Sequence, residues 1–136
     1  RNLIKKYAEE GMPIYAECGG LMYLTKSIDF GNKKYKMVGL FDAETQMTKK
    51  MTLNYTEGRI TSNCLISTPR KFRAHEFHYS KIRSLPRDVK LIYELKVGEG
   101  ISGRRDALFE YNTLASYCHL YFDSAKYATK LVSSRI

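Results

Sequence analysis

Cysteine is scarce in this sequence, and its spacing excludes two common structural uses. The three cysteines, Cys18, Cys64 and Cys118, are an odd number and include no Cys-x-x-Cys pair. A disulfide framework needs pairs and a zinc knuckle needs closely spaced ligands, so neither is expected. This cysteine content is typical of a reducing cytosol, and we therefore expect a cytoplasmic protein without a bound metal.

Long hydrophobic runs, internal repeats and low-complexity segments are also missing. No apolar stretch approaches the roughly 18 residues that a membrane-spanning helix requires, so no membrane partner is expected. The 136 residues are 43% hydrophobic, which is typical of one globular domain. This length is short for an enzyme that must also bind a nucleotide.

Acidic residues are outnumbered, but the excess of positive charge is dispersed. Asp and Glu number 14 against 23 Lys and Arg, and the net charge is +9. The basic residues form only doublets, such as Lys5 with Lys6 and Arg104 with Arg105, so a nucleic-acid partner is not expected. Such a surface suits contact with an acidic partner domain or a polycarboxylate substrate.

The first elements predict an α/β fold. Residues 2–10 place apolar side chains on one helical face, and Gly11 follows as a C-cap. A buried strand begins directly after Pro13. A helix followed closely by a strand is half of a βαβ unit whose first strand would precede Arg1. Because Arg1 is also not an initiator methionine, we expect a fragment whose N-terminal part is missing.

The stretch 13–27 predicts a cysteine at a sharp turn between a strand and a helix. Residues 14–16 form the strand, and the helix places Leu21, Leu24 and Ile28 on its apolar face. Cys18 is the candidate nucleophile, with Gly19 and the next glycine leaving room for substrate. The start of the helix would favour the thiolate and hold an oxyanion. The alternative is a small buried cysteine that fills the junction.

The rest of the sequence predicts further strands and one late helix. Val38 and Leu40 point inward from a strand over 33–41, and a half-buried antiparallel strand over 51–59 alternates Met51, Leu53 and Tyr55 with polar residues. Other strands are expected over 63–68, 72–80, 89–97, 106–111 and 115–122, with a glycine-rich turn at 98–103 and a helix capped by Asp123 or Ser124.

Three histidines could serve a cysteine nucleophile as its base: His75, His78 and His119. His119 is favoured because it stands at a strand end before a helix, where α/β proteins gather catalytic groups. The alternative is a histidine satisfied by backbone hydrogen bonds. His75 and His78 lie in a His-Glu-x-His sequence, which differs from the helical zinc motif, and on a strand they face opposite sides.

Three segments carry a family resemblance. They read Tyr-Ala-Glu-Cys-Gly-Gly-Leu-Met-Tyr-Leu, Arg-Ala-His-Glu-Phe-His-Tyr-Ser and Leu-Ala-Ser-Tyr-Cys-His-Leu-Tyr-Phe, in that order. Over nearly its whole length the chain resembles the glutaminase domain of cobyrinic acid a,c-diamide synthase. The resemblance implies an open three-layer, flavodoxin-like sheet as in class I glutamine amidotransferases. It also implies that Cys18 attacks glutamine, His119 activates it, the Gly19 amide contributes to the oxyanion hole, and His75 and Glu76 line the glutamine pocket.

The resemblance further implies that glutamine hydrolysis and ATP-dependent activation take place in two different domains. Residues 1–136 would be a partial C-terminal glutaminase domain without a cofactor of its own. A separate N-terminal domain would use ATP and Mg²⁺ to activate the a and c carboxylates of a tetrapyrrole, and ammonia would convert them to amides. A homodimer is one assembly that such a domain can form.

Two departures from the family pattern qualify the expected activity. Many class I glutaminases place a carboxylate two residues after the histidine, where this sequence has Tyr121. Glu17 and Glu76 are the candidates to orient His119 instead. The glycine-rich loop that completes the oxyanion hole would precede Arg1, and loss of one oxyanion donor typically costs ~10²- to 10³-fold in rate. The chain alone is therefore expected to be a poor glutaminase.

Other functions remain compatible with these residues. A nickel-sirohydrochlorin a,c-diamide synthase or a cobyric acid synthase would share the same chemistry. A domain of the same fold could also act only as a docking module, or as a cysteine hydrolase of another amide.

Overall fold

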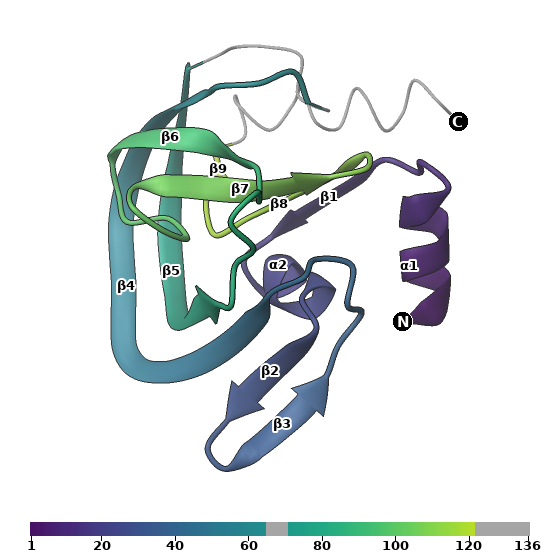
Figure 1. Cartoon of the computed structure of the whole chain (residues 1–136). Helices are drawn as coiled ribbons and strands as arrows, with labels where there is room; N and C mark the ends of the chain where they lie inside the picture. Colours follow the sequence, from purple (N-terminus) through teal and green to yellow (C-terminus); the bar gives the residue numbers. More distant parts are fainter. Residues whose placement is uncertain (65–70, 122–136) are drawn as a thin grey trace.

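Two short helices and a nine-stranded sheet form the part of the chain that the computed structural model describes, residues 1–64 and 71–121 (Figure 1). The elements are α1 (Asn2–Glu9), β1 (Ile14–Glu17), α2 (Gly19–Leu24), β2 (Ser27–Phe30), β3 (Lys33–Lys36), β4 (Glu44–Ile60), β5 (Lys71–Arg83), β6 (Leu91–Val97), β7 (Arg105–Glu110), β8 (Thr113–Ser116) and β9 (His119–Leu120). The α/β class predicted from the sequence is confirmed.

Most strand pairs in the sheet are antiparallel. The strand order is β1-β8-β7-β6-β4-β2-β3, and β5 pairs with β4 and β9. The β1–β8 and β2–β4 pairs are parallel. The long strands β4 and β5 run together through a register shift between Met47 and Thr52, and Figure 1 shows them side by side on the left of the view. Because β5 also pairs with β9, it links this long hairpin to the segment that carries His119.

The N-terminal elements agree with the sequence prediction. Helix α1 ends at Glu9, and Gly11 adopts a φ of +90°, a left-handed conformation that glycine reaches without steric cost. Strand β1 follows and pairs with β8 along its full length. The predicted helix, tight link and strand are therefore all present.

Helix α2 is shorter than predicted. It ends at Leu24 because Thr25 is extended (φ −71°, ψ 175°) and its hydroxyl bonds the Met22 carbonyl at 2.7 Å. Ile28 lies on β2, so the prediction that it shares the apolar face of the helix is wrong. Leu21 and Leu24 are buried as predicted. A short apolar segment can fit a helical or a strand period equally well, which explains the error.

Strand β3 is also shorter than the predicted strand over 33–41. Val38 and Leu40 are buried as predicted, but they lie in the connection to β4. Their backbone N–H groups bond the carbonyls of Tyr23 and Leu24 on the preceding helix at 3.0 Å. The connection therefore packs against α2 without forming a strand.

The alternation predicted over 51–59 is present on β4, but the buried face is the opposite one. Met51, Leu53 and Tyr55 are 42%, 60% and 82% exposed, whereas Thr52 and Thr56 are 8% and 2% exposed. A period of two identifies a strand but does not say which face meets the core. The inner face of β4 meets polar groups, and Thr52 bonds the Glu99 carboxylate at 3.3 Å.

The remaining sequence predictions have mixed outcomes. Strands β6 and β7 lie close to the predicted ranges, and 98–103 forms the expected turn, with positive φ at Gly98, Gly100 and Gly103. The predicted strand over 115–122 is divided between β8 and β9. Residues 65–68 of the strand predicted over 63–68 and the predicted C-terminal helix lie outside the described residues. No helix within the described ranges could cross a membrane.

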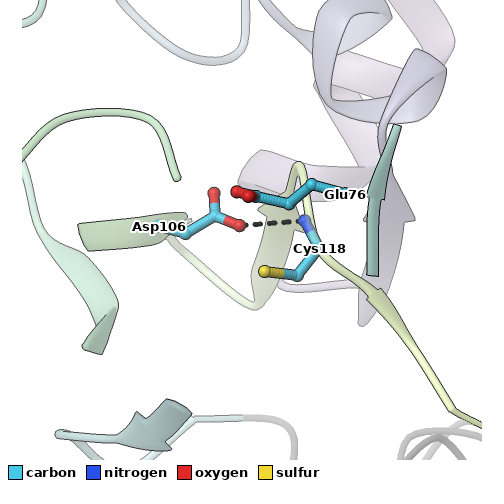
Figure 2. Close-up of side chains that lie close together, drawn as sticks. All are labelled: Glu76, Asp106 and Cys118. Atoms are coloured by element: carbon cyan, nitrogen blue, oxygen red, sulfur yellow. Dashed lines mark hydrogen bonds between the residues drawn. The ribbon is translucent and has the colours of Figure 1, made fainter. Parts of the chain in front are cut away.

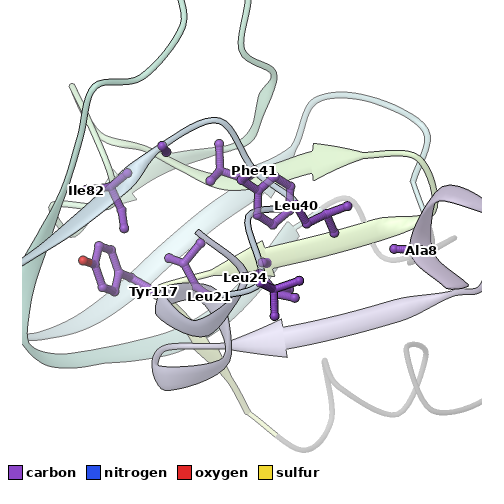
Figure 3. Close-up of a cluster of buried hydrophobic side chains, with 11 residues drawn as sticks. Ala8, Leu21, Leu24, Leu40, Phe41, Ile82 and Tyr117 are labelled. Carbon is purple, nitrogen blue, oxygen red and sulfur yellow. The ribbon is translucent and has the colours of Figure 1, made fainter. Parts of the chain in front are cut away.

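Two groups of buried side chains form the core. One surrounds α2 and is shown in Figure 3; it consists of Ala8, Leu21, Leu24, Val38, Leu40, Phe41, Ala43, Ile82, Leu108, Ala115 and Tyr117. The other consists of Ile60, Phe72, Ala74, Ile92, Tyr93, Leu95, Ala107, Leu114 and Cys118. Strands β7 and β8 contribute to both groups, so they tie the helical side of the core to the sheet.

We expect Gly58→Ala to destabilise the protein. A Cβ at Gly58 would lie 2.7 Å from Phe72 Cζ and 2.9 Å from the Glu94 carbonyl oxygen, and overpacking of this kind costs ~1–3 kcal/mol. Gly19→Ala is the matched control, since its Cβ would have no atom within 4 Å. Urea denaturation measures both; equal midpoints for the two variants would show that β4 and β5 are not tightly packed here.

We also expect His78 to make stability depend on pH. Its ring is buried, stacks on Tyr117 with centroids 3.7 Å apart, and bonds the Ser80 carbonyl through Nδ1 at 2.9 Å. Burial lowers the pKa of His78, so the unfolded chain binds a proton more readily. This contribution is complete above about pH 6.5 and is lost as pH falls, with a slope of up to ~1.4 kcal/mol per pH unit.

The free energy of unfolding, measured by urea denaturation between pH 7.5 and 5, should therefore fall less steeply in His78→Phe than in the unchanged protein. The control variant His75→Gln leaves the buried ring of His78 in place, so it should retain the slope of the unchanged protein. An identical slope in His78→Phe would contradict the assignment.

Candidate functional site

Cys18 stands at a strained bend between β1 and α2. Its φ of 46° and ψ of −101° lie in a region that residues with a side chain rarely adopt. Hydrogen bonds fix the bend on both sides: Cys18 N–H donates to the Ser116 carbonyl of β8 at 2.8 Å, and the Cys18 carbonyl accepts from Met22 N–H at 3.0 Å. The strained turn predicted at this position is present.

The two glycines after Cys18 have different surroundings. A Cβ on Gly19 would meet nothing within 4 Å, so the space beside the thiol is open. A Cβ on Gly20 would lie 3.0 Å from the Cβ of Ala16, closer than ordinary contact. Gly19 therefore leaves room for a ligand, and Gly20 allows α2 to approach β1.

The Cys18 thiol is half-buried, and Sγ donates to the Phe77 carbonyl oxygen of β5 at 3.5 Å. Burial raises the pKa of this thiol; the backbone N–H of Gly19 acts in the opposite direction, and the charge on Glu17 raises the pKa further. The start of the helix thus acts in favour of the thiolate, as expected, but burial outweighs its effect on the pKa of Cys18. Nucleophilic attack by Cys18 would therefore need a base.

His119 lies on β9 opposite His75 of β5. The two rings stack with centroids 4.7 Å apart and an interplanar angle of 7°. His119 Nδ1 lies 3.5 Å from Glu17 Oε2, and the side chains of His119 and Glu17 are 31% and 27% exposed. His119 is thus in contact with a ring on one side and a carboxylate on another, while part of its surface is open to solvent.

Glu17 joins β1 to β9. Its Oε1 accepts a hydrogen bond from the Tyr15 hydroxyl at 2.6 Å and another from Leu120 N–H at 3.0 Å. Burial raises the pKa of Tyr15, so its hydroxyl remains a donor. These bonds hold one oxygen of the carboxylate and leave the other directed toward His119.

The structure brings Cys18 and His119 to the same strand. Cys18 Sγ contacts the carbonyl of Phe77, and His119 pairs with His75, two residues earlier on β5. Within 1–64 and 71–121, no hydrogen bond joins Cys18 to His119. A Cys–His dyad therefore stays a prediction, supported by the shared neighbourhood of the two residues.

Glu76 faces away from this neighbourhood. It is fully buried, and its carboxylate accepts hydrogen bonds from the backbone N–H groups of Glu99 (3.0 Å) and Gly100 (2.6 Å) and from the Asn54 amide (3.2 Å). Of the two candidates to orient His119, Glu17 is the one that contacts it. Glutamine binding by His75 and Glu76 stays a prediction, and the Glu76 oxygens are already engaged by the protein.

Glu76, Asp106 and Cys118 form a buried cluster (Figure 2). Their potential ligand atoms lie within 4.8 Å of one another. Asp106 accepts hydrogen bonds from the N–H groups of Tyr117 at 3.1 Å and Cys118 at 2.9 Å. Burial raises the pKa of both Asp106 and Cys118.

Asp106 was not among the site residues predicted from the sequence. The carboxylate of Asp106 accepts hydrogen bonds from the N–H groups of Tyr117 and Cys118, in the turn directly before His119. These N–H groups are therefore not available for strand pairing, and the strand predicted over 115–122 is interrupted there. The only signal in the sequence is an acidic residue at the start of a predicted strand. The carboxylates in this cluster bind backbone N–H groups, which is a structural use of their oxygens.

Comparison of the sequence with known proteins gives a consistent result. The profile of the CobB/CobQ-like glutamine amidotransferase domain matches residues 1–127. Cobyrinate a,c-diamide synthase from Sulfurisphaera tokodaii is 47% identical over 124 residues, covering 90% of this chain and 28% of the relative. The synthase of the same name from Methanosarcina barkeri is 40% identical over 135 residues, covering 89% of this chain and 27% of the relative. The chain thus spans less than a third of these relatives.

Solved structures share the fold at low sequence identity. PurLQS from Thermotoga maritima superposes with a TM-score of 0.71 at 15% identity, covering 97% of this chain and 66% of that one. A crystal structure of a glutamine amidotransferase gives a TM-score of 0.64 at 18% identity, covering 96% and 66%. These similarities confirm the expected fold of class I glutamine amidotransferases.

We expect Cys18→Gly to be more stable than Cys18→Ala. Glycine adopts the backbone angles of Cys18 freely, whereas alanine keeps the steric strain, so the two variants should differ by ~1 kcal/mol or more in free energy of unfolding. Both variants remove the thiol, so the difference isolates the backbone. Urea denaturation measures it, and equal stabilities would show that the bend stores no strain.

Proposed function

The chain belongs to the family of CobB/CobQ-like glutamine amidotransferase domains, and from this membership we propose that it hydrolyses the side-chain amide of glutamine through Cys18 and His119. The observation that carries the proposal is the arrangement at β5. A cysteine on a strained bend and a histidine held by a carboxylate both contact this strand, two residues apart. A nucleophile, a base and a group that orients the base are the parts that such a hydrolysis needs.

In the proposed reaction, His119 removes the proton of Cys18 Sγ as the sulfur attacks the amide carbon of glutamine. The Gly19 N–H donates to the oxygen that becomes negatively charged. The carbon–nitrogen bond then breaks, and His119 returns the proton to the departing ammonia. Water, activated by the same imidazole, hydrolyses the thioester to release glutamate and the free thiol.

The surroundings of Cys18 support this assignment of roles. Burial keeps the thiol protonated, so a base must generate the thiolate at the moment of attack. The exposed Gly19 has no neighbour where a side chain would stand, which leaves space for the amide of a substrate.

We propose that the ammonia serves ATP-dependent amidation of the a and c carboxylates of cobyrinic acid in cobalamin biosynthesis, in the cytoplasm. The names and identities of the relatives support this role. In these relatives, about 70% of the length lies beyond the matched region, and we place the ATP and Mg²⁺ sites there. A nickel-sirohydrochlorin or cobyric acid synthase would use the same glutaminase chemistry.

A diazo-ketone analogue of glutamine tests the glutaminase assignment in the protein expressed from its natural gene. We expect selective alkylation of Cys18, with protection by glutamine, because only this thiol stands beside open space at the bend. Cys118 is fully buried and Cys64 is half-buried, so both act as internal references. Mass spectrometry of the digested protein identifies the labelled residue.

The same protein provides the controls. Cys18→Ser and His119→Asn should each lower glutamine hydrolysis by ~10³-fold or more, whereas Cys64→Ser should leave it unchanged. Labelling of Cys18 no faster than of Cys64, without protection by glutamine, would favour a non-catalytic docking module. Hydrolysis of other amides with indifference to glutamine would favour a different cysteine hydrolase.

A further inference from the structure

We infer that Glu17 is the positioning residue of His119 and takes the place of the carboxylate that other class I glutaminases supply after the histidine. This inference deepens the proposed function and rests on it. Glu17 Oε2 lies 3.5 Å from His119 Nδ1. The carboxylate thus comes from the residue directly before the nucleophile, on the strand that ends at the bend.

Two hydrogen bonds fix the carboxylate in this orientation. Oε1 of Glu17 accepts from the hydroxyl of Tyr15 at 2.6 Å and from the N–H of Leu120 at 3.0 Å. Leu120 directly follows His119, so the bond to its N–H also holds the backbone of β9 against β1. One oxygen therefore serves as an anchor, and the other is free to accept a hydrogen bond from the imidazole.

This arrangement selects one tautomer of His119. A proton on Nδ1 would point at Glu17, and Nε2 would then be the unprotonated nitrogen that accepts the proton of the Cys18 thiol. Stacking on His75 restricts the plane of the ring, and Glu17 restricts its rotation within that plane. The two contacts together orient an imidazole that stands on a strand of only two residues.

The other acidic candidate does not reach the imidazole. Glu76 lies on the buried side of β5, opposite the side where His75 meets His119, and its oxygens accept hydrogen bonds from residues 54, 99 and 100. Tyr121 occupies the position of the usual carboxylate, and its ring centroid lies 6.2 Å from that of His75. Tyr121 is thus part of the surroundings of the histidine pair but cannot accept as a carboxylate does.

The first test is the tautomer of His119 in the unaltered protein expressed from its natural gene. Long-range ¹H–¹⁵N correlation spectra of protein labelled on histidine should show the proton on Nδ1, with assignment by the loss of signals in His119→Asn. A proton on Nε2 would overturn the inference. This measurement needs no enzymatic activity, so it stands even if the protein does not hydrolyse glutamine.

The second test is glutamine hydrolysis by Glu17→Gln. The amide can present its NH₂ group to the imidazole and reverse the tautomer, so we expect kcat to fall ~10²- to 10⁴-fold while KM for glutamine changes less than about threefold. The histidine spectrum of the variant should lose the Nδ1–H signal. Glu17→Asp keeps a carboxylate and should recover part of the activity, which a purely steric role would not predict.

Glu94→Gln is the matched control, because Glu94 on β6 pairs with Arg59 on β4 at 2.9 Å, and among the described residues its carboxylate makes no hydrogen bond or ion pair with the site. It should keep the kcat of the unaltered protein. Suppose that the unaltered protein is active, and that Glu17→Gln keeps its kcat within about threefold and also keeps the Nδ1–H signal of His119. The positioning role of Glu17 is then wrong, and the glutaminase assignment stands. If the unaltered protein is inactive, the glutaminase assignment fails and the tautomer alone decides the role of Glu17.

Discussion

The left-handed backbone of Cys18 is the constraint on which the rest of the site depends. A chain that leaves a strand and enters a helix over a single residue must turn sharply, and a side chain at that residue is forced outward from the turn. The turn is held by β8 on one side and by the first helical hydrogen bond on the other. Sequence neighbours then acquire fixed places: Glu17 ends the strand, Gly19 opens the helix, and Gly20 lies where a side chain would crowd Ala16.

Strand β5 organises the opposite side of the same region. Its side chains alternate between an outer face with His75 and Phe77 and an inner face with Glu76 and His78. The inner face is unusually polar, and its carboxylate belongs to the cluster whose other acid, Asp106, holds the turn before His119. Buried polar groups on the inner side therefore fix the backbone just before His119, while His75 on the outer face of β5 contacts the His119 ring.

Local patterns in the sequence were sufficient for the helix over 2–9, the bend at Cys18 and the opposite orientations of His75 and His78. They were not sufficient where two structures fit one pattern. Ile28 suits a helix or a strand, and the alternation on β4 is equally regular with either face buried. Contacts with other segments decide both cases. Ile28 is in a strand because β2 pairs with β3, and the threonine face of β4 is buried because it meets polar groups in the interior.

The contacts around His119 illustrate a second limit. The sequence suggested Glu17 and Glu76 equally as partners of the imidazole, because both lie beside candidate site residues. The pairing of β9 with β5 and the path of β1 distinguish them, and these are long-range features. The role of Asp106 could not be predicted from its sequence neighbours for the same reason. Its hydrogen-bond partners are 11 and 12 residues away, in a turn that no local sequence pattern predicts.

The adjacency of Glu17 and Cys18 has a mechanical consequence. Two consecutive residues at the end of one strand cannot drift apart, so thermal displacement of β1 carries the thiol and the carboxylate in the same direction. The bond from Leu120 N–H to Glu17 makes β9 follow as well. Thermal motion of this sheet edge would thus move the thiol, the carboxylate and the imidazole together and preserve their alignment, even though β9 is only two residues long.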